Sequence, residues 1–176
     1  MLSINLDVED FLFKDISKEE LDLVLNLYNE SYDSMFATGK DKDLSFDDIK
    51  EKYLEVLINS HEYFSGIYLK NKKEMIGVIK GRIDYDDDEK FWISSFLIGK
   101  KYRNEGFGKR CIDAIITYMR ETYDVKIAIV GVISTNTSGI SFWQNIGFNY
   151  SRTINQFINL NNKLVDFIIM KKTISL

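Results

Sequence analysis

The stretch YRNEGFGKR, residues 102–110, lies between an apolar run and a segment with helical periodicity. The apolar run, WISSFLI at 92–98, has the aromatic and β-branched composition of a strand. The following segment, CIDAIITYM at 111–119, spaces its apolar residues as one face of a helix. Gly106 and Gly108 allow backbone conformations and close approaches that larger residues do not. The stretch therefore predicts a flexible, basic turn between a strand and a helix.

The start of that helix is a candidate site for an anion. A helix N-terminus offers unpaired backbone N–H groups and the positive end of the helix dipole, both of which favour phosphate oxygens. The charge pattern points the same way, because several cations gather here in a chain whose formal net charge is −4. We expect a ligand with several phosphates, and the alternative is a solvated glycine-rich turn. The cations, all within eleven positions, are Lys100, Lys101, Arg103, Lys109 and Arg110.

The two common nucleotide-binding motifs do not fit the stretch. The dinucleotide fingerprint needs a third glycine at position 111, where Cys111 stands. A P-loop needs glycine at position 103 and serine or threonine at position 110, and both positions hold arginine. The phosphate-bearing ligand is therefore not expected to bind through either motif.

Length and composition limit the remaining classes of protein. A chain of 176 residues with 45% hydrophobic and 14% aromatic residues is expected to form a single folded domain spanning 1–176. The negative net charge disfavours nucleic acid and anionic membrane as partners. No apolar run approaches the roughly 20 residues that span a bilayer. Residues 1–11 lack the basic start and apolar stretch of a signal peptide, so we expect a cytoplasmic protein.

The cysteine and histidine content argues against a metal site. Cys111 is the only cysteine, and its spacing from Ile112, Ile115 and Met119 predicts a buried, inert thiol on a core-facing helix. His61 is the only histidine, and no second soft ligand lies near it in the sequence. We therefore expect no metal and no internal disulfide.

The order of elements predicts an α/β (α+β) fold. Ser17 with Glu20, and Ser45 with Asp48, have the spacing of capping boxes that begin two helices. An antiparallel meander of three strands is expected next, and a strand–helix–strand–helix–strand order with a final hairpin follows. We expect a mixed, mainly antiparallel central sheet of about six to seven strands flanked by about four helices. The expected strands are 63–69, 75–85, 91–98, 126–133, 150–159 and 164–171, and the later helices are 108–121 and 137–145.

A second motif, NTSGISFWQNIGF at 136–148, follows the basic turn by about thirty residues. An asparagine leaves a strand, a short helix ends in two aromatic residues, and a Gly-Phe pair comes after it. Together the two motifs resemble those of the GNAT superfamily, the acyl-CoA-dependent N-acyltransferases. The resemblance covers essentially the whole chain, including the final strand at 166–172. It rests on Arg103, Gly106 and Gly108 in the first motif and on Asn136, Phe142, Gly147 and Phe148 in the second.

The resemblance implies a GNAT-like fold that uses acetyl-CoA as its acyl donor. The strands at 91–98 and 126–133 would part to admit the pantetheine arm, which would pair with the end of the first strand. The basic turn would hold the pyrophosphate, and the second motif would border the coenzyme. The residues assigned to the coenzyme are Phe96, Leu97 and Ile98 for the arm, Arg103, Asn104, Glu105, Gly106, Phe107, Gly108 and Lys109 for the pyrophosphate, and Asn136, Ser138 and Phe142 beside it.

The implied activity is transfer of an acetyl group to a primary amine of a small molecule or peptide, by a monomer or homodimer. A backbone N–H near Leu97 or Ile98 could stabilise the oxyanion. The family's usual tyrosine acid is replaced by Trp143, which we expect to pack against the sheet. Glu89 and Ser95 are the candidate catalytic residues. The alternative is a non-catalytic CoA-binding regulatory or interaction module.

Two acidic segments suggest a cationic acceptor if they border the cleft. Solvated turns that keep the protein soluble are the alternative interpretation. The segments are Asp84 with Asp86, Asp87, Asp88 and Glu89, and Asp33, Asp41, Asp43, Asp47 and Asp48.

Overall fold

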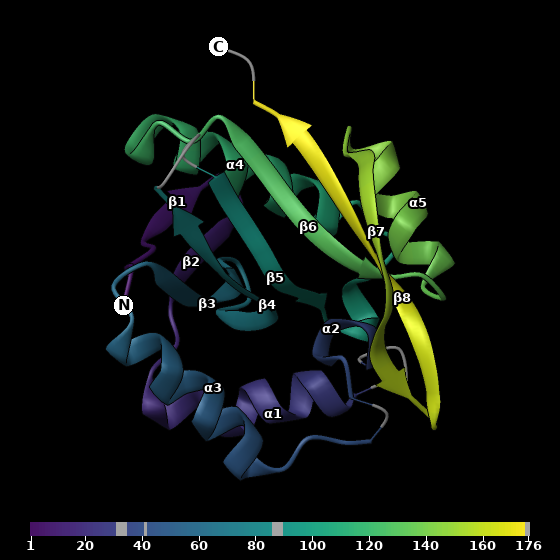
Figure 1. Cartoon of the computed structure of the whole chain (residues 1–176). Helices are drawn as coiled ribbons and strands as arrows, with labels where there is room; N and C mark the ends of the chain where they lie inside the picture. Colours follow the sequence, from purple (N-terminus) through teal and green to yellow (C-terminus); the bar gives the residue numbers. More distant parts are fainter. Residues whose placement is uncertain (31–34, 41, 86–89, 175–176) are drawn as a thin grey trace.

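The computed structural model describes residues 1–30, 35–40, 42–85 and 90–174 (Figure 1). Its strands form one eight-stranded sheet in the order β1-β2-β3-β4-β5-β6-β8-β7. Only β5 and β6 are parallel, and the other neighbours are antiparallel. The expected α/β class with a mixed, mainly antiparallel sheet is confirmed. The strands are β1 Leu6–Val8, β2 Phe11–Asp15, β3 Glu62–Leu69, β4 Glu74–Asp84, β5 Lys90–Ile98, β6 Ile127–Ile133, β7 Asn149–Leu160 and β8 Lys163–Thr173.

Five α-helices and two 3-10 turns accompany the sheet within the described residues. Both expected capping boxes are present, with Ser17 at the turn that leads into α1 and Ser45 at the start of α3. The helices are α1 Leu21–Asn29, α2 Met35–Thr38, α3 Phe46–Ile58, α4 Phe107–Tyr123 and α5 Thr137–Asn145, and the 3-10 turns are η1 Lys18–Glu20 and η3 Lys100–Tyr102.

The sheet has more strands than the six to seven expected from the sequence, because β1 and β2 were not predicted. These two strands are only three and five residues long, too short for a clear alternation. Phe11 and Phe13 are nevertheless buried, and β2 pairs with β3 along its whole length. The extra strands therefore depend on contacts with β3, which lies about fifty residues later in the chain.

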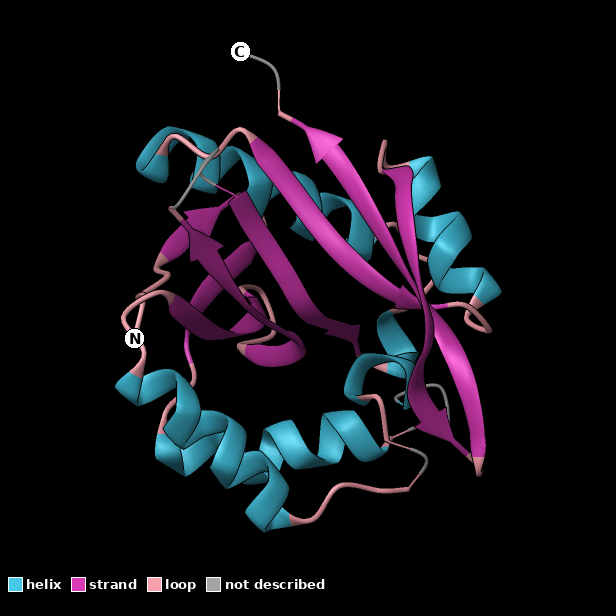
Figure 2. Cartoon of the chain, viewed as in Figure 1, coloured by secondary structure: helices cyan, strands magenta, loops and turns pink. Residues whose placement is uncertain are grey.

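The helices cover the two faces of the sheet, as Figure 2 shows. On one face α1 and α3 bury an apolar cluster that includes Val24, Ile49 and Leu97. On the other face α4 contributes Ile112 and Ile115 to the larger cluster. Cys111 belongs to that second cluster and is buried, as expected, and its burial raises the pKa of the thiol to about 12. The thiol therefore stays protonated.

The centre of the sheet contains a bulge in β5 and an early end to the pairing between β5 and β6. Lys80 lies opposite Ser95 and Gly81 opposite Ile93, so Ser94 is the extra residue. A Cβ at Gly81 would lie 1.9 Å from the carbonyl oxygen of Trp92, so only glycine fits beside this bulge. The pairing of β5 with β6 covers only Lys90–Ile93 opposite Ile127–Val130. The strands part after Ile93, as the sequence led us to expect.

None of the helices traced in the structure is long and apolar enough to cross a membrane. In those same parts of the chain, histidine, cysteine, aspartate and glutamate side chains form no group of three or more that could hold a metal ion.

Glu20 connects the beginning of α1 to the sheet. Its carboxylate accepts hydrogen bonds from the Tyr68 hydroxyl (2.7 Å), the Lys14 ammonium (2.9 Å) and the Ser17 amide (3.0 Å). Burial by itself raises the pKa of this carboxyl group, but the three hydrogen bonds outweigh it and lower the pKa to about 2. The ionised form of Glu20 therefore stabilises the contact of α1 with β2 and β3.

Replacing Glu20 should change how stability depends on pH. A folded-state pKa near 2, below the ordinary value of 4.5, gives stabilisation that is complete above about pH 5 and is lost as pH falls towards 2. Between pH 7 and pH 3, we expect the wild type to lose roughly 1–2 kcal/mol more unfolding free energy than Glu20→Gln. Urea unfolding at the two pH values measures this difference. Glu51→Gln, on the exposed side of α3, should behave as the wild type. Equal losses in Glu20→Gln and the wild type would contradict the assignment.

Candidate functional site

A cavity of about 510 Å³ opens where β5 and β6 part. Its wall combines the free end of β5, the facing part of β6, the N-terminus of α4, helix α5 and one turn from α2. Because α4 and α2 belong to opposite faces of the sheet, the cavity passes between the two strands from one face towards the other. The lining residues include Phe36, Ser95, Phe96, Arg103, Gly108 and Asn136.

The basic turn predicted from the sequence forms one end of this cavity. Asn104 and Gly106 adopt positive φ values of 64° and 78°, and Gly106 is the N-cap of α4. Gly108, in the first turn of the helix, packs so closely that an added Cβ would lie 3.3 Å from the ring of Phe142. The first amides of α4 have no partner within the helix, so they are suited to bind an anion here. Asn104, Gly106, Gly108 and Lys109 all line the cavity.

The five cations of this region do not form one cluster, which corrects the expectation from the sequence. Arg103 and Lys109 line the cavity, and the Arg103 Nε donates to the carbonyl of Ile98 at 2.8 Å. Arg110 lies one position further along α4 and points to the β1–β2 turn. There its guanidinium pairs with Glu9 at 2.9 Å and with Asp10 at 2.7 Å. Lys101 pairs with Glu74 and lines a separate groove. Lys100 lines neither that groove nor the cavity.

The free end of β5 presents alternate backbone groups to the cavity. The amide of Gly99 donates to Ile76 of β4 at 2.8 Å, so the backbone groups of Leu97, two residues earlier, also face β4. The backbone N–H and C=O groups of Phe96 and Ile98 must then point into the gap where β5 separates from β6, which we call the parting. The Ile98 carbonyl already accepts from Arg103. Of the two amides that the sequence suggested for an oxyanion, the Ile98 N–H has the suitable direction and the Leu97 N–H does not.

Helix α5 forms the wall opposite β5. The Asn136 side-chain oxygen accepts from the Gly139 amide (2.9 Å) and from the Ser138 hydroxyl (3.1 Å), so it caps the helix. Phe142 stacks on Phe96, with ring centroids 6.1 Å apart. Asn136, Ser138 and Phe142 all line the cavity. Their assignment to a coenzyme stays a prediction.

Two residues of the predicted turn do not line the cavity. The Phe107 ring points into the core, where it packs edge-on against Phe11 at 5.8 Å and Tyr102 at 6.1 Å. Glu105 is exposed to solvent. Only the backbone of these two residues remains available to a ligand.

Trp143 packs in the core, as expected from its place in the sequence. Its side chain is buried, and its ring lies 5.0 Å from Phe142, 5.0 Å from Phe148 and 6.0 Å from Phe96 between centroids. An indole has no acidic proton near neutral pH, so Trp143 supports the shape of the cavity and cannot act as a proton donor.

Of the two candidate catalytic residues, only Ser95 lies in the described part of the chain. Glu89 is outside the described residues. Ser95 lines the cavity, and its hydroxyl lies 2.9 Å from the hydroxyl of Tyr28 on α1. Tyr28 is one of the buried residues of α1. Burial raises the pKa of Tyr28 to about 12, and the bond to Ser95 offsets only part of this effect.

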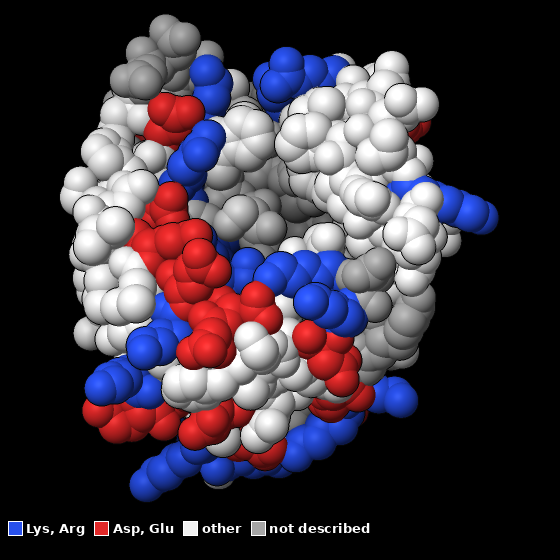
Figure 3. Space-filling model, turned by 60° about the horizontal axis from the view of Figure 1, so that its bottom comes forward, with Lys and Arg blue, Asp and Glu red and all other residues white. Residues whose placement is uncertain are grey.

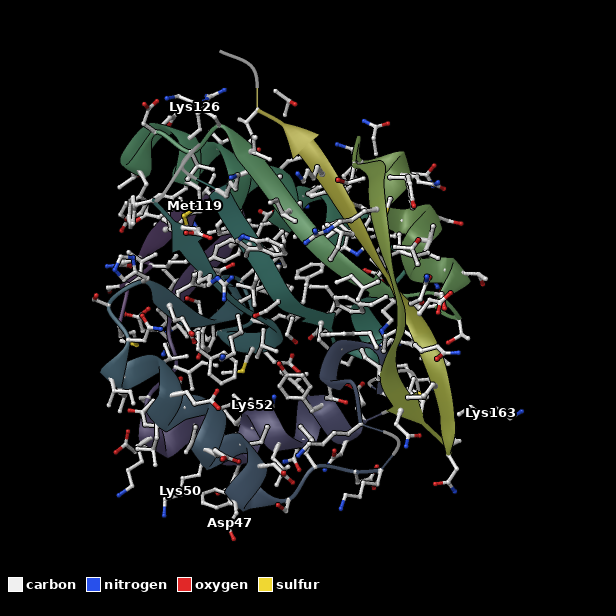
Figure 4. The ribbon with its side chains drawn as sticks, in the orientation of Figure 1. Asp47, Lys50, Lys52, Met119, Lys126 and Lys163 are labelled. Atoms are coloured by element: carbon white, nitrogen blue, oxygen red, sulfur yellow. The ribbon has the colours of Figure 1, made fainter. Side chains whose placement is uncertain are left out.

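The acidic segments do not line the cavity as far as the structure describes them. Asp43 and Asp47 are exposed, and Figure 4 shows Asp47 pointing away from the sheet. The Asp48 carboxylate accepts from the Ser45 amide in the capping box of α3 and pairs with Lys40, which holds the pKa of this carboxyl far below its ordinary range. Figure 3 views the molecule from the side of α1 and α3, where acidic and basic side chains are interspersed. Asp33, Asp41, Asp86, Asp87 and Asp88 are outside the described residues.

Comparison with known proteins agrees with the family resemblance. A family model described as "Acetyltransferase (GNAT) domain" matches residues 14–169. The chain is 31% identical over 71 residues to the "Probable spermine N(1)-acetyltransferase" of Bacillus subtilis subsp. natto (strain BEST195). It is 30% identical over 71 residues to the "Spermine/spermidine N(1)-acetyltransferase" of Bacillus subtilis (strain 168). Each match covers 39% of this chain and 47% of the relative, so it spans about half the length of these curated relatives.

Solved structures share the fold across nearly the whole chain. The spermidine N-acetyltransferase from Vibrio cholerae, in complex with CoA and spermine, has a TM-score of 0.79 at 17% identity, covering 93% of this chain and 95% of that one. The ribosomal-protein-S5-alanine acetyltransferase from Vibrio fischeri has a TM-score of 0.77 at 14% identity, covering 97% and 96%. Identities this low show a common fold and do not identify a substrate.

Changing Trp143 to tyrosine should destabilise the protein. The smaller ring would leave part of the space between Phe96 and Phe148 unfilled, which we expect to cost about 1–2 kcal/mol. For a chain of this size, the thermal midpoint should fall by about 3–6 °C. Differential scanning calorimetry measures the change, and Tyr150→Phe, at an exposed aromatic position, is the control. A midpoint equal to that of the wild type would show that Trp143 is not part of the packing.

Proposed function

Because the chain belongs to the GNAT family of acetyltransferases, we propose that it transfers an acetyl group from acetyl-CoA to a primary amine. The observation that carries the proposal is the cavity between β5 and β6, which joins an anion-binding helix start to an unpaired strand end. We also propose that residues 1–176 form one such domain. The proposal extends to a cytoplasmic protein that is a monomer or homodimer, which cell fractionation and sedimentation velocity can test.

The residues around the cavity fit the chemistry of coenzyme A. The amides at the start of α4, with Arg103 and Lys109 beside them, suit the pyrophosphate. The backbone groups of Phe96, which face the parting, suit the amides of an extended pantetheine arm, in the way that a peptide adds to a sheet edge. Phe142 and Phe96, stacked on each other, give the arm one apolar wall. Acetyl-CoA supplies an activated acyl group as its thioester.

The chemistry needs few groups from the protein. The amine nitrogen attacks the thioester carbonyl carbon, a C–N bond forms as the C–S bond breaks, and the amine releases a proton to water. The Ile98 N–H can stabilise the negative charge that develops on the acyl oxygen. A thiol with a pKa near 8.5 leaves as a thiolate without a dedicated acid. The position of Trp143 is therefore compatible with turnover.

We propose a small-molecule polyamine as the acceptor class. The two curated relatives are named for spermine and spermidine, and this supports the choice over a peptide acceptor. No carboxylate lines the described part of the cavity, so a hydrogen-bonded neutral amine is the species that would enter it.

The test of the proposed function is an assay with acetyl-CoA and a panel of amines. Release of free thiol is followed with spermine, spermidine, an amino sugar and a peptide with a free N-terminus, and the acetylated product is identified by mass spectrometry. We expect turnover with the polyamines to exceed turnover with the peptide. CoA binding without turnover on any amine would instead support a non-catalytic CoA-binding module.

Two arginines of the basic turn give a matched test of the phosphate contact. Arg103→Glu and Arg110→Glu change the net charge equally, but only Arg103 lines the cavity. We expect Arg103→Glu to weaken CoA binding about tenfold or more, since a charge-assisted hydrogen bond contributes roughly 1.5–3 kcal/mol. Calorimetric titration with CoA measures both affinities.

Arg110→Glu should bind CoA within about threefold of the wild type, because its guanidinium is directed to Glu9 and Asp10. Equal weakening in the two variants would mean that the turn attracts CoA by its net charge alone.

A further inference from the structure

A pair of hydroxyl groups joins α1 to the wall of the cavity. The Tyr28 hydroxyl lies 2.9 Å from the Ser95 hydroxyl, and the two residues are 67 positions apart in the chain. Tyr28 is 1% exposed and belongs to the apolar cluster under α1, together with Val24 and Leu97. The pair is thus a polar contact inside an otherwise apolar interface between α1 and β5.

Stability alone does not explain this pair. A buried phenol needs a hydrogen-bond partner, and replacing both hydroxyl groups with apolar groups of similar shape is nearly neutral. Leu97, the next residue of β5 on the same face, makes its contact with α1 through an apolar side chain. An apolar side chain at position 95 and phenylalanine at position 28 would serve the packing equally well. We therefore expect the two hydroxyl groups to have a function in the cavity.

Ser95 occupies a particular place in that cavity. It follows the bulge at Ser94 and directly precedes Phe96, whose backbone groups face the parting. Lys80 lies opposite Ser95 on the neighbouring strand β4. The Lys80 ammonium is paired with Glu62 at 3.2 Å and with Glu55 at 3.5 Å. Either hydroxyl can be the donor in the bond between Tyr28 and Ser95. Where Tyr28 donates, the Ser95 hydroxyl keeps a second lone pair and its own proton for a ligand.

We propose that Ser95 accepts a hydrogen bond from the N–H of the acceptor amine, and that Tyr28 is the positioning residue that fixes the Ser95 hydroxyl for this contact. The inference rests on the proposed function and adds how the acceptor nitrogen is held. Ser95 lies on the face of the sheet that carries α1, and the anion-binding start of α4 lies on the other face. The amine would therefore approach the thioester from the side opposite the coenzyme phosphates.

Tyr28 keeps its phenol proton, and so can donate a hydrogen bond, at any pH near neutral. Burial raises its pKa to about 12, so the phenol stays protonated over the range in which the enzyme would work. A permanently protonated Tyr28 can donate to Ser95, which holds the Ser95 side chain in one rotamer and directs its remaining lone pair. The pair transfers no proton in this scheme, and the amine proton passes to water.

The first test measures binding without turnover. The probe is a conjugate in which an acetyl bridge joins the CoA sulfur to spermine, and its affinity is compared with that of CoA alone by calorimetry. The wild type should bind the conjugate more tightly than CoA. Tyr28→Phe and Ser95→Ala should each reduce that preference about five- to tenfold, with CoA affinity unchanged.

The second test separates positioning from a general loss of structure. Tyr68→Phe is the matched control, since the Tyr68 hydroxyl is bonded to Glu20 at 2.7 Å in the same apolar cluster and lies away from the cavity. We expect Tyr68→Phe to lower stability but not the preference for the conjugate. Ser95→Thr keeps the hydroxyl and should retain most of the preference. In steady-state assays Tyr28→Phe should lower kcat/KM for spermine and leave the KM for acetyl-CoA unchanged.

The outcomes distinguish the two levels of the proposal. If the wild type binds the conjugate no better than CoA, the proposed function is wrong and this inference falls with it. If the wild type prefers the conjugate and Tyr28→Phe and Ser95→Ala keep that preference in full, the proposed function survives and the role of the hydroxyl pair is overturned. If the double variant loses only as much preference for the conjugate as either single variant, the two hydroxyl groups act through one shared contact.

Discussion

The incomplete pairing of β5 with β6 is the constraint on which the site depends. The two strands are hydrogen-bonded only over Lys90–Ile93 on β5, while β5 continues along β4 to Ile98. The bulge at Ser94, which requires glycine at position 81, lies at the point of separation. Backbone groups left without a strand partner must be satisfied by a side chain, as the Ile98 carbonyl is by Arg103, or by solvent or a ligand. The parting therefore creates both the cavity and a strand edge that an extended ligand can use.

The directions of the charged side chains around the cavity depend on their ion pairs within the fold more than on the amino-acid composition of this segment. Arg103 and Lys109 lie at the start of α4 and line the cavity, whereas Arg110 is drawn to Glu9 and Asp10. The cavity wall carries no described carboxylate. Positive charge is thus confined to the end where phosphates would bind, and the inner part of the wall offers hydroxyl and backbone groups.

The inner part of the cavity combines rigid packing with few polar side chains. Trp143 is held among Phe96, Phe142 and Phe148 and gives the wall its shape. Ser95 is a polar group that the fold holds in place there, through Tyr28. A reaction whose leaving group is a thiolate needs orientation of the amine more than strong acid catalysis. Such a wall is consistent with that requirement.

The sequence by itself determined the features that depend on neighbouring residues. The strand–turn–helix around Gly106 and the capping boxes at Ser17 and Ser45 follow from local conformational preferences, and the two motifs identified the family.

Only the tertiary structure decided the contacts between distant segments. It added β1 and β2 to the sheet, turned Arg110 away from Arg103, and brought Tyr28 to Ser95 across 67 positions. Apolar spacing along a helix predicts which face is buried, but it carries no information about which hydroxyl the side chain of Tyr28 will meet. Local sequence fixes backbone preferences over a few residues, whereas these contacts exist only after the chain has packed.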